Sequence, residues 1–101
     1  MIDLPLEIVR FVQEHQPPIV EAQFCDSTGR LHTFVDKSAI FTTDWGLEAS
    51  SEYPQPGVIR CDELSRYQNP EGLEVVRVRT EVESTEGLSE FVVLASQFSA
   101  R

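Results

Sequence analysis

The sequence predicts a small, mostly β domain that carries one helix at its N-terminus. Several segments alternate apolar and polar residues with a period of two, isolated glycines stand at turn positions between them, and one early segment has helical spacing. The expected strands close most simply as a five-stranded antiparallel bent sheet or small barrel, with the helix across one open end. An open α+β sheet with the helix on one face is the alternative.

The N-terminal helix is expected over about residues 4–15. Asp3 is placed to cap its free amide groups, and proline is tolerated in the first turn. Pro17 and Pro18 are expected to stop the helix, because proline disfavours helical geometry in its predecessor and lacks an amide donor. The apolar-leaning stripe at helical spacing consists of Leu4, Ile8, Phe11, Val12 and His15.

Five strands are expected after this helix, over about residues 19–26, 30–42, 57–67, 73–82 and 88–98. In the first of them Val20, Ala22 and Phe24 face one side, and Gly29 in the following turn is expected to adopt a positive φ. Polar residues 36–38 predict a bend or bulge within the second strand. The last strand is apolar on both faces at residues 91–94, which is typical of a strand covered on both sides.

The longest connection spans residues 43–56 and contains two large aromatic residues, Trp45 and Tyr53. Aromatic side chains in a long loop often anchor interfaces, so these two are candidate interface residues. In the alternative, both rings fold back over the open end of a small core. The chain length of 101 residues suits one domain, so residues 1–101 are expected to share a single core.

Charge and hydropathy exclude several classes of function. The formal net charge of −9 opposes nucleic acid, whose binding depends on Lys and Arg at phosphates. No apolar stretch is long enough to cross a membrane, and the N-terminus lacks the basic and apolar regions of a secretory signal. A cytoplasmic location is therefore expected.

Reactive residues are few. Cys25 and Cys61 are expected to be small buried hydrophobes rather than a disulfide, because a cytoplasmic compartment is reducing. The cysteines and histidines show no metal-ligand spacing, and the glycines form no phosphate loop, so neither a metal nor a cofactor is expected and no catalytic residue is assigned. A thiol or acid–base enzyme remains an alternative, in which His32 meets Cys25 or a carboxylate across the first hairpin.

One segment, residues 29–41, has a glycine, alternating apolar positions and then Asp36 on the way to the next strand. It resembles the first motif of the Sm-like small β-barrel family, whose members bind RNA and assemble into rings. The asparagine that follows the aspartate in that family, and its Arg-Gly motif, are absent here. The chain also looks like one of the small bacterial proteins for which family membership implies no activity.

The leading functional hypothesis is a noncatalytic acidic protein-interaction module. Its acidic surface suits a basic protein partner, and unpaired strand edges suit self-association into a homo-oligomer. An RNA-binding Sm-like protein is the alternative. It requires four basic residues to converge on one face beside an exposed aromatic ring, namely Arg30, Lys37, Arg77 and Arg79.

Overall fold

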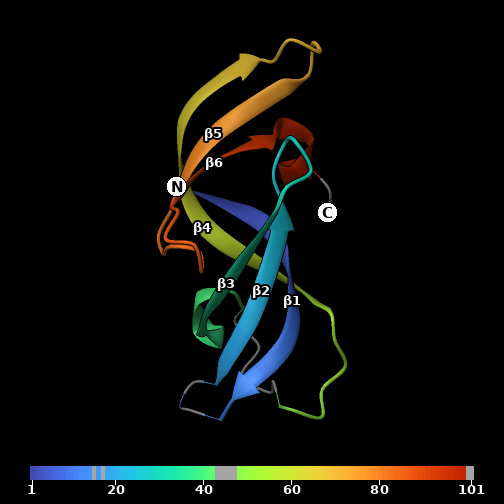
Figure 1. Cartoon of the computed structure of the whole chain (residues 1–101), viewed down its shortest axis with the longest axis vertical. Coiled ribbons are helices and arrows are strands. Elements are labelled where there is room, and N and C mark those ends of the chain that lie inside the picture. The colour runs from blue at the N-terminus through green and yellow to red at the C-terminus, as the bar shows by residue number, and fades with distance from the viewer. Residues whose placement is uncertain (15, 17, 43–47, 100–101) are drawn as a thin grey trace.

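The computed structural model describes residues 1–14, 16, 18–42 and 48–99. It contains six strands in one antiparallel sheet of order β3-β2-β1-β4-β5-β6, and two short 3-10 helices, η1 and η2 (Figure 1). The elements are β1 (Ile2–Gln13), β2 (Ile19–Cys25), β3 (Leu31–Lys37), η1 (Ser38–Ile40), β4 (Gln55–Gln68), β5 (Glu74–Thr80), β6 (Glu90–Leu94) and η2 (Ala95–Ser99). The prediction of a mostly antiparallel, barrel-like β fold is confirmed.

The expected N-terminal helix is wrong, because residues 2–13 form strand β1. Leu4 and Ile8 are four residues apart, and this spacing puts them on one face of a helix and equally on one face of a strand. Leu6 distinguishes the two conformations: it is buried together with Leu4 and Ile8, which is the period of a strand. The sheet of the described residues therefore has six strands rather than five.

Strand β1 lies at the centre of the sheet, between β2 and β4. Leu4 is opposite Ile59 of β4, and Ile8 is opposite Ala22 of β2. Pro5 has no amide hydrogen to donate, and it lies ahead of Glu7, where pairing with β2 begins. Two register shifts in the β1–β2 ladder then bend the strand beyond Ile8.

Two strands are shorter than expected. The expected strand over residues 30–42 ends at Lys37, because Ser38 turns the chain: its amide donates to Pro18 O at 2.7 Å and its carbonyl accepts from Phe41 N at 2.9 Å. The expected strand over residues 88–98 ends at Leu94, whose amide donates to the side chain of Gln97 at 2.8 Å. A 3-10 helix follows each strand, in place of a bend or a continuation.

The sheet curls into an incomplete barrel around one core. The amide of Ser27, in the β2–β3 turn, donates to Val92 O of β6 at 2.8 Å, and Thr85 N donates to Thr33 O of β3 at 2.8 Å. These bonds draw the two margins of the sheet together. The buried core consists of Leu4, Leu6, Ile8, Val20, Ala22, Phe24, Phe34, Phe41, Ile59, Cys61, Val76, Val78, Phe91 and Val93.

The β4–β5 hairpin extends beyond this body as an arm (Figure 1). Strand β4 pairs with β1 up to Cys61 and with β5 from Cys61 to Gln68, so each half of this long strand has one neighbour in the sheet. The molecule is elongated as a result, with extents of 43 × 24 × 23 Å. Within the described residues, no helix has the length and apolarity needed to span a membrane.

Candidate functional site

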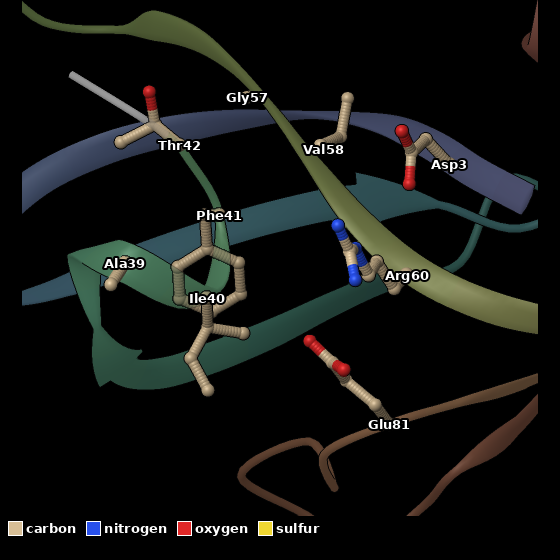
Figure 2. Close-up of a pocket in the computed structure, with 9 residues that line it drawn as sticks. All are labelled: Asp3, Ala39, Ile40, Phe41, Thr42, Gly57, Val58, Arg60 and Glu81. Atoms are coloured by element: carbon tan, nitrogen blue, oxygen red, sulfur yellow. The ribbon is translucent and has the colours of Figure 1, made fainter.

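One groove, the Arg60 groove, has a volume of about 550 Å³ and lies beside the first half of β4 (Figure 2). Four parts of the chain contribute to it: β1, η1 with the two residues after it, β4, and the residue after β5. Its lining residues are Asp3, Ala39, Ile40, Phe41, Thr42, Gly57, Val58, Arg60 and Glu81.

Backbone bonds to β4 set the two ends of this groove. Val58 N donates to Phe41 O at 2.8 Å at one end, and Glu81 N donates to Arg60 O at 3.1 Å at the other. Gly57 permits the close approach of the first of these segments, since a Cβ there would lie 2.9 Å from the carbonyl oxygen of Phe41. The groove is thus fixed by backbone contacts of a sheet strand and not by long side chains.

The charged side chains of the Arg60 groove have no ion-pair partners in the part of the chain that the structure describes. Figure 2 shows the guanidinium of Arg60 pointing between the carboxylates of Asp3 and Glu81. Within the described residues, none of the three forms an ion pair or a side-chain hydrogen bond. Two carboxylates and one guanidinium leave the groove with a net negative charge, beside an apolar wall of Ile40 and Val58.

The acidity extends to the strand beneath the groove. Burial, together with the carboxylates of Asp62 and Asp3, raises the pKa of the Cys61 thiol to about 11. Cys61 is therefore an inert core thiol, as expected. Cys25, by contrast, is exposed on the outer face of β2, so the expectation that both cysteines are buried is wrong for this one.

A second groove, the Arg30 groove, lies where the β2–β3 turn meets β5 and β6 and has a volume of about 330 Å³. Its lining residues are Asp26, Ser27, Thr28, Arg30, His32, Arg77, Leu88, Glu90, Phe91 and Val92. Here the charges are paired: Arg30 binds Glu86 at 2.9 Å, and Arg77 and Arg79 bind Glu90 at 3.1 and 3.3 Å.

The floor of the Arg30 groove includes a buried histidine bound to a carboxylate. His32 is 3% exposed, and its Nε2 lies 2.7 Å from Oδ2 of Asp26. Because an ionised carboxylate only accepts, Nε2 carries the hydrogen of this bond. Burial would raise the pKa of Asp26, but hydrogen bonds from His32 and from the turn residues outweigh it and lower this pKa to about 2. Nδ1 of His32 has no partner among the described residues.

No protein-family model matches the chain, and no curated protein or solved structure is similar enough to match it. The function is therefore argued from the residues of the chain itself.

Of the four basic residues expected to contact RNA, three come together. Arg30 and Arg77 line one groove, and Arg79 shares Glu90 with Arg77. Lys37 is the last residue of β3, opposite Ile19 and at the other end of the strand from Arg30. The aromatic rings that line the Arg30 groove, His32 and Phe91, are both buried, so an exposed stacking ring is lacking among its lining residues.

The geometry separates the thiol and imidazole of the enzyme hypothesis. His32 is opposite Phe24 and points into the core, whereas Cys25 is opposite Leu31 and is exposed. Neighbouring residues of a strand point to opposite faces, so the two groups lie on different sides of the sheet. His32 does meet a carboxylate, Asp26, but that carboxylate also binds the amides of Thr28 and Arg30 and so anchors the turn.

The two aromatic residues proposed as interface anchors differ in what can be said of them. Trp45 lies outside the described residues. Tyr53 is half-buried and packs against the core, and its hydroxyl donates to Glu48 O at 2.7 Å. Tyr53 therefore covers the core, which agrees with the second interpretation of this loop.

Sequence reasoning missed the charged residues of the Arg60 groove. Asp3 resembled a helix cap, and Arg60 and Glu81 stood within or beside strands without any motif. The pairing of β1 with β4 places Asp3 opposite Arg60, and the pairing of β4 with β5 brings Glu81 beside Arg60. The Asp26–His32 bond had a local signal, because an aspartate that opens a hairpin turn often folds its side chain back onto the turn.

Proposed function

We propose that the protein is a noncatalytic acidic protein-interaction module whose Arg60 groove receives a basic segment of a partner protein. The observation that carries this proposal is the pair of carboxylates, Asp3 and Glu81, which have no ion-pair partner among the described residues and share the groove with the apolar residues Ile40 and Val58. Lys and Arg side chains combine an apolar stem with a charged head. Such a side chain can lay its stem along these apolar residues and bring its head against one of the two carboxylates.

The charge of the whole protein favours the same class of partner. A net charge of −9 attracts basic proteins over a long range and raises their association rate. Elsewhere on the described surface, five basic side chains already form ion pairs with glutamates of the chain. They are Arg10, Arg30, Arg66, Arg77 and Arg79. The carboxylates of the Arg60 groove are left for a partner.

The strand edges are poorly suited to pairing with another strand, which favours the groove as the binding site. On β3, the carbonyl of Thr33 is taken by Thr85, and the amide of Lys37 is taken by its neighbour Asp36 at 2.8 Å. The open side of the β4 arm carries a register shift and the ion pair of Arg66 with Glu63. Bulges, charges and covered backbone groups discourage the addition of another strand. Self-association through an edge is therefore the less favoured route.

The test is a titration with a short peptide of alternating lysine and leucine, monitored by calorimetry at two salt concentrations. The double variant Asp3→Asn/Glu81→Gln is expected to weaken binding roughly tenfold, since each lost charge pair contributes somewhat under 1 kcal/mol. The matched control is Glu14→Gln/Glu71→Gln, which removes the same charge from exposed, unpaired positions outside the groove.

Equal weakening by both double variants would show that only the overall field matters and would contradict a binding groove. Light scattering on the same samples measures the oligomeric state, and a stable dimer or ring would favour self-association instead. An RNA titration completes the comparison. Binding of RNA with steep salt dependence, lost in Arg77→Gln, would favour the Sm-like alternative over the acidic module.

A further inference from the structure

Three arginines come together at the Arg30 groove, each paired with a glutamate. Arg30 comes from the β2–β3 turn and Arg77 from β5, and both line the same small groove. Arg79 stands two residues further along β5 and binds the same glutamate as Arg77. Three of the seven basic side chains in the described part of the chain thus meet here. Such convergence from separate elements is what an anion site requires.

We propose that the Arg30 groove binds the phosphoryl group of a small phosphate monoester, held by the guanidinium groups of Arg30 and Arg77. A guanidinium presents a planar fork of donors that matches phosphate oxygens, and it stays charged at any physiological pH. A phosphate dianion can accept from two guanidinium groups at once. This site is separate from the Arg60 groove and does not depend on the function proposed for it.

Two glutamates now accept the hydrogen bonds of these arginines. Both oxygens of Glu86 accept from Arg30, at 2.9 and 3.0 Å, and Glu90 accepts from Arg77 at 3.1 Å. These ion pairs are exposed, with the Glu86 and Glu90 side chains 54% and 45% accessible. Exposed pairs contribute little stability, so a dianion that engages both arginines can displace the carboxylates.

The rest of the groove suits the organic part of such a ligand. Leu88 is 37% exposed at the rim, and Val92 is half-buried beside it. Below them, the ring of His32 packs against that of Phe91 with centroids 4.6 Å apart. A volume of about 330 Å³ accommodates a phosphoryl group with a short carbon chain. Inorganic phosphate is the minimal ligand for these guanidinium groups.

The experiment follows the backbone amide signals of the whole protein by NMR during titration with inorganic phosphate, glycerol phosphate and, as a singly charged control, acetate. Shifts are expected around the β2–β3 turn and β6 with both phosphates and not with acetate. Arg30→Gln and Arg77→Gln should each weaken binding about tenfold, since each removes one charge-assisted contact. Glu86→Gln should strengthen it roughly fivefold, because the competing carboxylate is gone.

Arg66→Gln is the matched control, since Arg66 is also exposed and also binds two glutamates, at 2.7 and 3.2 Å, but on the β4–β5 arm. Binding of both phosphates supports a phosphoryl site, and binding of glycerol phosphate alone supports one that needs the apolar rim. The proposal is overturned if neither phosphate binds, if Arg66→Gln weakens binding as much as Arg77→Gln, or if Glu86→Gln leaves the affinity unchanged. The Glu86→Gln variant still tests the proposal if an arginine variant fails to fold.

Discussion

The two grooves lie on the same sheet, but they differ in whether their charged side chains form ion pairs with other described residues. In the Arg60 groove, the charged side chains have no ion-pair partner among the described residues, and backbone bonds alone fix the walls. In the Arg30 groove, side-chain bonds join the β2–β3 turn to the β5–β6 connection, and Glu86 and Glu90 satisfy the arginines. The first is open to a partner as it stands, whereas the second also holds the barrel closed.

This difference separates stability from binding. Changes to the buried part of the Arg30 groove should alter the free energy of unfolding, because Phe91 packs in the core and the bond of Asp26 to His32 anchors the β2–β3 turn. Changes of surface charge in the Arg60 groove should alter binding and leave the fold intact, because Asp3, Arg60 and Glu81 form no side-chain bond within the described residues. The following predictions test this separation.

The largest effect is expected from Phe91→Ala. Phe91 is 4% exposed, forms the floor of the Arg30 groove, and packs edge-on against Phe24 and against Phe34, with centroids 5.2 and 5.9 Å apart. Loss of the ring leaves a cavity and should reduce the free energy of unfolding by about 3–5 kcal/mol. Urea denaturation measures this loss. A loss below about 1 kcal/mol would show that the closure of the barrel does not depend on this ring.

The next effect is the acid sensitivity of the Asp26–His32 bond. The pKa of Asp26 is about 2, below its ordinary value of 3.8, so the ionised carboxylate stabilises the folded state. This contribution, about 2 kcal/mol, is fully present above pH 4 and is lost as the pH falls towards 2.

Asp26→Asn should therefore lower stability at pH 7 and make the remaining stability less dependent on pH between about 4 and 2. Denaturation curves of both proteins over this pH range provide the measurement. Asp62→Asn is the control, because Asp62 is an exposed carboxylate without an ion pair among the described residues. An unchanged acid slope in Asp26→Asn would assign the acid sensitivity to other groups.

A smaller effect is expected at the Arg60 groove from Gly57→Ala. The added Cβ would lie 2.9 Å from Phe41 O and 3.1 Å from the side chain of Ile8, so the segment after η1 must move outward. We expect a loss of about 1–2 kcal/mol, measured by thermal unfolding, together with weaker peptide binding. Gly72→Ala is the comparison: nothing lies near its Cβ, but its φ of 81° is unfavourable for alanine, so it should affect stability without affecting binding.

The smallest effect is expected on the β4–β5 arm. Hydrogen bonds from Arg66 lower the pKa of the exposed Glu63, yet the pair is screened by water and salt. Arg66→Gln should leave the melting temperature unchanged within error by scanning calorimetry. A clear decrease would show that the arm is coupled to the closure of the barrel.

Local patterns predicted the parts of the fold that short segments decide. The alternation of Val20, Ala22 and Phe24 gave the correct buried face of β2, and Gly29 has the expected positive φ of 84°. The ends of β3 and β6 were not predictable in the same way. They depend on Pro18 O and on the Gln97 side chain, which bind the amides of Ser38 and Leu94 from outside the strands.

The sequence by itself determined an acidic, mostly β chain with turns at Gly29, Gly72 and Gly87, because charge, alternation and turn chemistry are properties of neighbouring residues. Tertiary structure alone decided that residues 2–13 are a strand and that Asp3 lies opposite Arg60. The physical reason is the spacing of Leu4 and Ile8, which satisfies both periods. The local sequence therefore leaves the choice to β4, a strand more than forty residues away, whose pairing with β1 also creates the Arg60 groove.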